Sequence, residues 1–284
     1  MANIKIVTDS TSDLPRDVAE TYGIEKIPLK VHFGSETYLD GVDLQSAEFF
    51  RKLAESAELP TTSQPSPVEF MEVYKKLADT PDTVIISLHI SSAFSGTIQS
   101  ATLAKSLLEE QVRIEIVDSK STSYGLGMMA IAAAEAAREG KSVEEILEIV
   151  QRIRRETRLF FIVDTLEYLQ KGGRIGKAAA MLGSLLNLKL ILTVDDSGEV
   201  APVDKIRGSK KAVARVIELL QKDFGDRTVD VCVVHSVARE RAEELLSLVS
   251  EALKVRNHTY SELGPVLGTH AGPGTLGVFV TPAR

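Results

Sequence analysis

The hydrophobic and polar positions in the first half of the chain alternate between two patterns. Short apolar runs rich in β-branched residues, typical of buried strands, are separated by longer stretches in which apolar residues follow a helical period. The pattern predicts strands at 4–10, 27–33, 83–90 and 113–119, and helices near 45–57, 67–78, 96–109 and 127–140. Because apolar strands that alternate with helices favour parallel pairing, this half predicts a mainly parallel α/β sheet.

The pattern changes after a helix predicted at 140–156, in which Ser142 and Glu145 have the spacing of a capping box. Beyond it, residues 189–206 predict a hairpin turned at the sequence DDSG. The other elements expected are strands at 158–164, 228–236 and 276–282, and helices at 177–187, 209–225 and 238–253. A hairpin with returning strands predicts an α+β domain with a mostly antiparallel sheet, so we expect two domains, at 1–155 and 156–284.

Composition and charge exclude several classes of function. The 284 residues carry 33 Lys and Arg against 40 Asp and Glu, a net charge of −7, with no Trp and no basic tract, so nucleic acid is not an expected partner. The N-terminus lacks the pattern of a signal peptide, and Ser184, Asn187 and Lys189 interrupt the most apolar stretch. We therefore expect a cytoplasmic protein with no transmembrane segment. Cys232, the single cysteine, lies in an apolar run and is expected to be buried.

Two polar turns precede predicted helices. In SSAFSGT, residues 91–97, Ser95, Gly96 and Thr97 fall at a helix N-terminus, where free backbone N–H groups and the helix dipole attract an anion. The simpler interpretation is that Ser95 caps the helix. The sequence TTSQPSP at 61–67 also places hydroxyls before a helix, and two such turns in one α/β domain favour convergence on a carboxylate or phosphate.

His270 lies in the glycine-rich sequence LGTHAGPGTLGVF, where no helix or strand is expected. Glycines let a backbone approach a ligand closely, and an imidazole held there can donate to an acidic head group. The alternative is a simply exposed histidine. The other four histidines are scattered without a second ligand at metal-binding spacing, so we expect no metal site.

The segment 169–180, LQKGGRIGKAAA, resembles a phosphate-binding loop at first sight. It fails the pattern because Lys171 stands at the first glycine position and Ala178 at the hydroxyl position. It is therefore expected to be a turn. Arg174, a long cation between glycines, could face a ligand or a partner protein.

A hydrolase or transferase that acts on a small acid or ester, with Ser95 as nucleophile and His270 as base, is the alternative function. The nucleophile elbow G-x-S-x-G is missing around Ser95, and no aspartate is favoured as a third member. Asp9 and Asp118 are more simply strand-end residues that cap the next turn.

Six segments occur in an order and spacing that match a known family. They are VTDSTSDLP at 7–15, IPLKVHFGSETYLDG at 27–41, TSQPSP at 62–67, SSAFSGT at 91–97, KGGRI at 171–175 and GTHAGPG at 268–274. Together they resemble the DegV family of fatty-acid-binding proteins, some of which are acyl-carrier subunits of bacterial fatty acid kinase. The resemblance implies a Rossmann-like N-terminal α/β domain, a C-terminal domain with an antiparallel sheet, and a fatty acid held between them.

The resemblance also implies which residues bind the carboxylate. They are Thr62 and Ser63, with Thr61 adjacent, then Ser95 with the backbone of Gly96 and Thr97, and finally His270. Arg174 is the arginine of the KGGRI segment, and Arg207 lies in IRGSKKA, where the family often has another basic residue in place of Ser209. Both arginines are candidates for contact with the head group or a kinase subunit. The chain departs from the family at Ala93 and Phe94, where the family usually has Gly and Leu.

These implications make the protein a binding protein rather than an enzyme, with a long-chain fatty acid as ligand and no cofactor. The expected protein partner is the catalytic subunit of a fatty acid kinase. A carboxylate removed from water needs several donors, and the acyl chain adds about 0.8 kcal/mol per buried CH₂. Apolar lining is expected from residues 128–134 and 178–188, although both are also simple core helices.

Overall fold

The computed structural model describes residues 3–108, 112–182 and 188–284. Their contacts divide the chain into two compact units, each formed by two segments: unit 1 is Met1–Leu44 with Pro60–Arg155, and unit 2 is Gln45–Leu59 with Glu156–Arg284. Residues 45–59 thus pack with the C-terminal segment. The expected domain limits of 1–155 and 156–284 remain a prediction.

Unit 1 is built on a four-stranded sheet in which every pair is parallel, as predicted. The strand order is β2-β1-β6-β7. The strands are β1 (Asn3–Asp9), β2 (Ile24–Ile27), β6 (Thr83–His89) and β7 (Arg113–Asp118). All seven residues of β6 are buried, which is the pattern of a central parallel strand covered on both faces.

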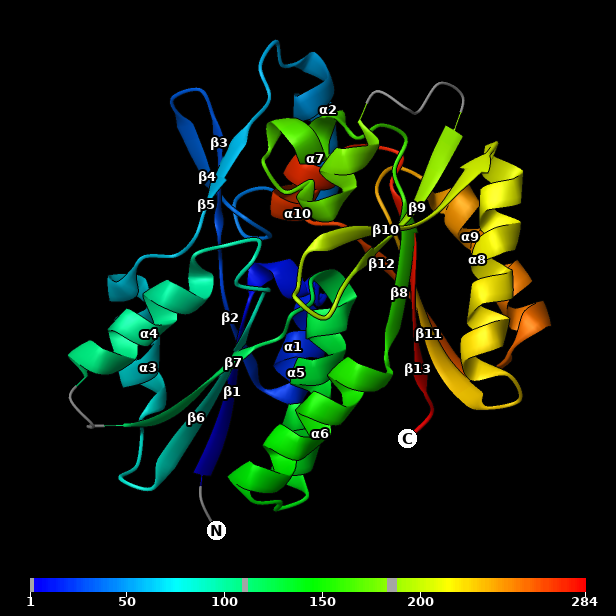
Figure 1. The fold of residues 1–284 in the computed structure, drawn as a ribbon. Coiled ribbons are helices and arrows are strands. Elements are labelled where there is room, and N and C mark those ends of the chain that lie inside the picture. The colour runs from blue at the N-terminus through cyan, green and yellow to red at the C-terminus, as the bar shows by residue number, and fades with distance from the viewer. Residues whose placement is uncertain (1–2, 109–111, 183–187) are drawn as a thin grey trace. The chain divides into compact units, whose positions relative to one another are not determined.

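Helices cover both faces of this sheet (Figure 1). They are α1 (Arg16–Tyr22), α3 (Pro67–Leu77), α4 (Thr97–Leu107), α5 (Ser123–Arg138) and α6 (Val143–Glu156). On one face, Phe70 and Tyr74 of α3 and Ala101 of α4 pack against Val7 and Ile85. The Ala-rich helix α5 packs against β1 on the other face, because its small residues let the helix lie close to the sheet.

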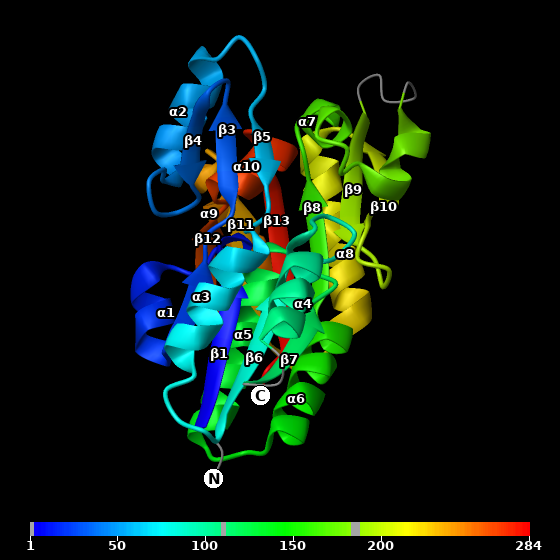
Figure 2. The same cartoon turned by 90° about the vertical axis from the view of Figure 1, so that its left-hand side faces the viewer.

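A second, three-stranded antiparallel sheet in unit 1 has the order β4-β3-β5 (Figure 2). Its strands are β3 (Lys30–Phe33), β4 (Glu36–Leu39) and β5 (Thr61–Ser63). The single strand expected at 27–33 is wrong, because β2 ends at Ile27 and β3 begins at Lys30. Pro28 lies at this break and has no N–H to donate to a ladder. β4 and β5 were not predicted, since both are short and mostly polar.

Unit 2 contains a six-stranded sheet of order β10-β9-β8-β13-β11-β12. The strands are β8 (Arg158–Ile162), β9 (Leu188–Val194), β10 (Val200–Arg207), β11 (Thr228–His235), β12 (Lys254–Glu262) and β13 (Leu276–Pro282). Among the strand pairs of the described residues, only β11–β12 is parallel, so the predicted mostly antiparallel sheet and the 189–206 hairpin are confirmed. β12 was missed because it is a largely exposed edge strand without an apolar run.

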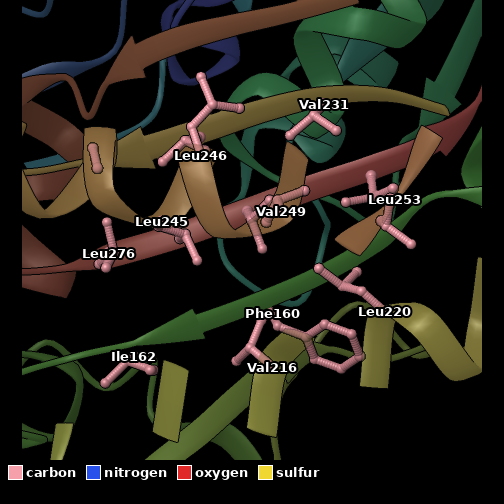
Figure 3. Close-up of a cluster of buried hydrophobic side chains, with 14 of the residues drawn as sticks. Phe160, Ile162, Val216, Leu220, Val231, Leu245, Leu246, Val249, Leu253 and Leu276 are labelled. Carbon is pink, nitrogen blue, oxygen red and sulfur yellow. The ribbon is translucent and has the colours of Figure 1, made fainter. Parts of the chain in front are cut away.

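The helices of unit 2 are α2 (Ser46–Glu55), α7 (Glu167–Lys171), α8 (Ser209–Phe224), α9 (Arg239–Ala252) and α10 (Pro265–Ala271). α8 and α9 pack on the sheet through one apolar cluster, shown in Figure 3, that joins Val216 and Leu245 to Phe160 of β8. α10 lies close to α2: a Cβ added at Gly268 would be 2.7 Å from the Phe49 ring. This contact explains why residues 45–59 pack with unit 2.

Short 3₁₀ helices follow β1 and α7: η1 at Ser10–Ser12 and η2 at Gly176–Met181. The helix expected at 177–187 is therefore observed as η2, and its residues 183–187, like part of the acyl lining expected at 178–188, lie outside the described residues. None of the helices in the described part of the chain has the length and apolar character needed to cross a membrane. Cys232 is buried, as expected.

Candidate functional site

The carboxyl ends of the parallel strands of unit 1 meet at one edge of the sheet. Thr8 lies opposite Leu88, and His89 lies opposite Asp118, so β1, β6 and β7 end at the same level. β1 is flanked by β2 on one side and β6 on the other, so the connections from β1 and β6 leave in opposite directions. This is the topological switch point, where open α/β sheets bind ligands.

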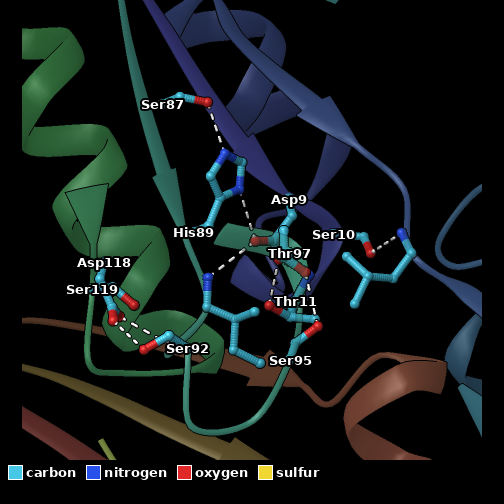
Figure 4. Close-up of polar contacts among 12 residues, drawn as sticks. Asp9, Ser10, Thr11, Ser87, His89, Ser92, Ser95, Thr97, Asp118 and Ser119 are labelled. Atoms are coloured by element: carbon cyan, nitrogen blue, oxygen red, sulfur yellow. Dashed lines mark hydrogen bonds and ion pairs between the residues drawn. The ribbon is translucent and has the colours of Figure 1, made fainter. Parts of the chain in front are cut away.

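The turn from β6 to α4 lies at this edge and contains Ser95, Gly96 and Thr97 as predicted. The N-cap of α4 is Gly96, which has no side chain to cap the helix, so the interpretation of Ser95 as N-cap is wrong. The Ser95 hydroxyl instead lies 2.8 Å from the Thr97 hydroxyl (Figure 4). Gly96 therefore offers no side-chain acceptor to the first N–H groups of α4. The hydroxyls of Ser95 and Thr97 lie beside these N–H groups.

The turn containing Ser95 is in direct contact with the segment 61–67. A Cβ added at Gly96 would lie 2.9 Å from Nε2 of Gln64, so the Gly96 backbone lies against this side chain. The two polar turns that the sequence analysis singled out separately are therefore neighbours within unit 1.

Within the segment 61–67, capping and strand pairing use different residues. Ser66 is the N-cap of α3: its hydroxyl accepts a hydrogen bond from the N–H of Glu69, and the Ser66 N–H donates to the Glu69 carboxylate at 2.7 Å. Thr61–Ser63 instead form β5, which pairs with β3. The cap is thus formed by Ser66, which leaves the hydroxyls of residues 61–63 for other contacts.

One of these hydroxyls contacts a histidine that the sequence did not single out. Ser63 Oγ lies 2.9 Å from Nε2 of His32, whose Nδ1 lies 2.9 Å from the Thr37 hydroxyl. Because the β3–β4 and β3–β5 pairings bring these residues together, the contact depends on the small sheet that the sequence pattern did not predict.

The aspartates at the ends of β1 and β7 cap the next turns, as expected. Asp9 accepts a hydrogen bond from the Thr11 N–H at 3.0 Å. Asp118 accepts from the Lys120 N–H at 3.0 Å and from the Ser92 hydroxyl at 2.5 Å. Burial raises the pKa of Asp118, but the hydrogen bonds from Lys120 and Ser92 outweigh it and lower the pKa overall, so its carboxylate is charged at neutral pH.

The glycine-rich sequence around His270 is not the loop that we expected. Residues Pro265–Ala271 form helix α10, with Pro265 in the first turn and Gly272 as the C-cap at a φ of 75°. Gly272 also lies against the ring of Tyr168, where a Cβ would overlap it. These glycines therefore serve close packing within unit 2, which sequence composition alone did not reveal.

His270 is brought together with the KGGRI segment. A Cβ on Gly172 would overlap the imidazole of His270, so the ring lies directly against the Gly172 backbone. Arg174 turns back to donate from Nη1 to the Gly172 carbonyl at 2.7 Å. The two motifs, separated by almost a hundred residues in the sequence, thus form one cluster in unit 2 that holds a cation and an imidazole.

The charge state of His270 follows from this cluster. Burial, and then the positive charge of Arg174, lower the pKa of His270 to about 4. At neutral pH the imidazole is therefore neutral and offers one N–H donor, while Arg174 supplies the positive charge. This pair has the chemistry that recognises an anion.

The remaining candidate residues, Arg207 and Thr61, lie at exposed ends of strands. Arg207 is exposed at the end of β10, and Thr61 is exposed at the start of β5. Among residues 3–108, 112–182 and 188–284, no group of three or more metal-ligating side chains is found.

Known proteins are similar to this chain over both of its units. A family model described as an uncharacterised protein of the DegV family matches residues 3–283. A DegV domain-containing protein of Caldanaerobacter subterraneus is 40% identical over 282 residues, which cover 98% of this chain and 99% of that protein.

Solved structures are similar over the full length. A structure described as fatty acid binding of a DegV family protein from Thermus thermophilus has a TM-score of 0.89 at 40% identity and covers 100% of both chains. DegV of Bacillus subtilis, described as a fatty acid binding protein, has a TM-score of 0.90 at 35% identity and the same coverage. A stearic-acid-binding protein from Eubacterium ventriosum has a TM-score of 0.90 at 28% identity, with 98% of each chain covered.

By its fold, this is one of the proteins that join a parallel α/β unit to an α+β unit with a mostly antiparallel sheet. The chain belongs to the DegV family.

Proposed function

We propose that this protein binds one long-chain fatty acid without a covalent bond and recognises it by its carboxylate. The observation that carries the proposal is the uncapped N-terminus of α4 beside the hydroxyls of Ser95 and Thr97, at the ligand-binding edge of the sheet. Similarity to structures described as fatty acid binding supports the choice of ligand.

In the proposal, unit 1 supplies neutral donors to the carboxylate. The hydroxyls of Ser95 and Thr97, the first N–H groups of α4, and the hydroxyls of Thr62 and Ser63 are the proposed set. A buried carboxylate needs several hydrogen bonds to offset its lost hydration, and N–H groups at a helix N-terminus suit it because the helix dipole is positive there.

Unit 2 supplies the His270 and Arg174 pair. We assign a carboxylate-binding role to this pair as well, with His270 donating a hydrogen bond and Arg174 balancing the charge. A neutral imidazole suits this role, because it donates without needing to bind a proton first.

The acyl chain is the second part of the proposal. Each CH₂ removed from water contributes about 0.8 kcal/mol, so a long chain binds tightly without covalent attachment. The carboxylate donors then select among amphiphiles of equal length, because a donor set left unpaired by an alcohol or ester costs free energy.

We further propose that the bound carboxylate is presented to a separate ATP-dependent kinase, as the family resemblance implies. The protein would act as the carrier and would not itself transfer the phosphoryl group. Arg207, exposed on β10, is a candidate for the contact with that kinase.

The alternative function, a hydrolase with Ser95 as nucleophile and His270 as base, is not supported by the pKa of His270. A general base works best with a pKa near the working pH, and His270 has a pKa of about 4.

Binding titrations with palmitic acid and hexadecanol test the proposal. We expect the acid to bind at least about tenfold more tightly than the alcohol of equal chain length, because only the acid satisfies the donors. Ser95→Ala and His270→Ala should each reduce this preference. Equal binding of acid and alcohol by the unmodified protein would refute the proposal.

A further inference from the structure

Four fully buried side chains of unit 1 form one continuous hydrogen-bonded chain that the proposed binding site does not use. Nδ1 of His89 lies 3.0 Å from Oδ2 of Asp9, Nε2 of His89 lies 2.7 Å from Oγ of Ser87, and Ser87 Oγ lies 2.8 Å from the Tyr74 hydroxyl. Each of the four side chains is 0% exposed. Figure 4 shows Asp9, His89 and Ser87 in this order.

The order Asp9, His89, Ser87 is that of a hydrolytic triad, but the placement of the serine rules out this role. Ser87 lies in the middle of β6, is fully buried, and shares a hydrogen bond with Tyr74. A nucleophile must be presented to its substrate, whereas this hydroxyl faces the core. The chain therefore needs another explanation.

The hydrogen bonds to Asp9 set the direction of the chain at its first link. Asp9 accepts hydrogen bonds from the N–H groups of Thr11 and Ile90, each at 3.0 Å, and from the Thr11 hydroxyl at 2.5 Å. An ionised carboxylate can only accept, so Nδ1 of His89 also donates to it. The other ring nitrogen of His89, Nε2, is paired with Ser87 Oγ, which is in turn paired with the Tyr74 hydroxyl.

Asp9 consequently joins two turns. On one side it holds Thr11, in the turn that follows β1. On the other side it holds the N–H of Ile90, the first residue after β6, in the turn that leads to Ser95 and α4. These are the turns on either side of the switch point. His89 fixes which way the carboxylate faces, because it binds Oδ2, the same oxygen that accepts from Ile90.

We propose that Asp9, oriented by His89, is a positioning residue for carboxylate recognition. It fixes the start of the β6–α4 turn and thereby places Ser95, Thr97 and the first N–H groups of α4 where an anionic head group can accept from them. Donors hold a ligand well only when supporting contacts fix their own positions, and four hydrogen bonds to one buried charge provide this. The inference rests on the proposed function and deepens it.

Asp9→Asn tests the inference. Asparagine keeps the size of the side chain but has one acceptor oxygen, so either Thr11 or Ile90 loses its acceptor whichever way the amide faces. We expect the ratio of the hexadecanol Kd to the palmitic acid Kd to fall at least about tenfold, while the Kd of hexadecanol stays within about threefold of the unmodified protein. A general loss of structure would instead weaken both ligands.

Tyr74→Phe is the matched control. It removes a buried hydroxyl from the far end of the same chain and leaves the His89 and Asp9 contact in place. We expect a lower melting temperature and an unchanged ratio of the two dissociation constants. Among His89 variants, His89→Asn, which keeps an N–H donor for Asp9, should retain more of the ratio than His89→Leu, which has none.

NMR of the unmodified protein tests the inference even if Asp9→Asn does not fold. The Nδ1 proton of His89 is buried and hydrogen-bonded, so it should give a slowly exchanging NMR signal that shifts when palmitic acid binds and not when hexadecanol binds. An unchanged signal, an unchanged ratio in folded Asp9→Asn, or an equal fall of the ratio in Tyr74→Phe would overturn the inference. Absence of acid preference in the unmodified protein would overturn the proposed function as well, and this outcome is distinct from the other three.

Discussion

His270 shows how far the surroundings of one residue decide its chemistry. As a histidine in a glycine-rich sequence it was compatible with either an exposed or a ligand-binding role. In the structure it lies against Gly172 with Arg174 nearby, and its pKa falls to about 4 because burial and a positive charge both disfavour the imidazolium ion.

The titration of His270 can be followed by NMR. The protein alone should show a His270 pKa near 4, and Arg174→Met should raise it toward the ordinary value of 6.5, because one of the two lowering causes is removed. Arg207→Met is the control, since Arg207 is not among the charges that shift His270. Bound palmitic acid should also raise this pKa, because a carboxylate stabilises the imidazolium. A His270 pKa unaffected by Arg174→Met would contradict the geometry.

The same shift predicts a pH dependence of stability. Between pH 4 and 6.5 the unfolded chain binds a proton at residue 270 that the folded protein does not, so the free energy of unfolding should rise with pH across this window and level off above it. Urea unfolding at several pH values, compared between the unmodified protein and His270→Gln, measures the contribution. A contribution that grew as the pH fell would contradict the sign.

The Ser95 hydroxyl carries the most direct test at the level of one atom. Ser95→Ala removes a donor to the proposed carboxylate, and a hydrogen bond to a charged group is worth about 1.5–3 kcal/mol, so the affinity for palmitic acid should fall roughly 10- to 100-fold. Ser106→Ala is the control, because this exposed hydroxyl of the same helix donates to the carbonyl of Thr102. Equal affinities of the two variants would place the head group elsewhere.

Single residues were predictable where their role is local. Ser95, Gly96 and Thr97 were expected at a helix N-terminus and are there, since a strand followed by a polar turn and an amphipathic helix is a local pattern. The contacts of His32 with Ser63 and of His89 with Asp9 were missed because strand pairing creates both. The register of a strand pair cannot be predicted from either strand alone.

At the scale of elements, capping and binding are separate in the segment 61–67. Ser66 forms a capping box with Glu69 at the start of α3, and Ser142 forms the same box with Glu145 at the start of α6, as predicted from its spacing. The hydroxyls proposed for binding lie three or more residues earlier, in β5.

Ser66→Ala and Ser63→Ala should therefore have different effects. Loss of the cap should lower the free energy of unfolding by about 1 kcal/mol without changing the affinity for palmitic acid. Ser63→Ala should reduce the binding free energy of palmitic acid by more than it reduces the free energy of unfolding. Ser142→Ala, the matched cap in α6, should resemble Ser66→Ala in a urea titration. Loss of affinity in Ser66→Ala equal to that in Ser63→Ala would show that the two roles are not separable.

The glycines near α10 make a prediction about packing. Gly272→Ala places a Cβ at a φ of 75° and a ψ of 173°, a region that is essentially limited to glycine, and against the Tyr168 ring, whereas Gly34→Ala, at a φ of 57°, has no atom within 4 Å of the new Cβ. The backbone cost of a left-handed residue, which applies to Gly34→Ala, is about 1–2 kcal/mol. Thermal unfolding should therefore show a clearly larger loss for Gly272→Ala than for Gly34→Ala, and equal losses would contradict the described contact.

Most elements could be predicted from their periodicity, because a buried strand such as β6 and amphipathic helices such as α6 carry the pattern in their own residues. The elements that were missed, β4, β5, β12 and α10, share a different property. Each is short, polar or glycine-rich, so its conformation is decided by what it packs or pairs with rather than by its own pattern.

At the scale of the whole molecule, the sequence distinguished a parallel α/β half from a mostly antiparallel half, and both sheets are observed. It did not reveal that residues 45–59 pack with the C-terminal segment. The contact of Gly268 with the Phe49 and Phe50 rings, which holds α2 to α10, joins residues more than 200 positions apart in the chain and leaves no local trace.

Native mass spectrometry of the freshly purified protein tests the central claim most directly. The account predicts a complex heavier than the 30.9 kDa chain by the mass of one fatty acid, released intact on activation and identified by its carboxylate in the lipid extract. Protein stripped of lipid should regain one equivalent when palmitic acid is added, and should bind hexadecanol more weakly. A lipid-free protein that takes up no added palmitic acid would contradict the account.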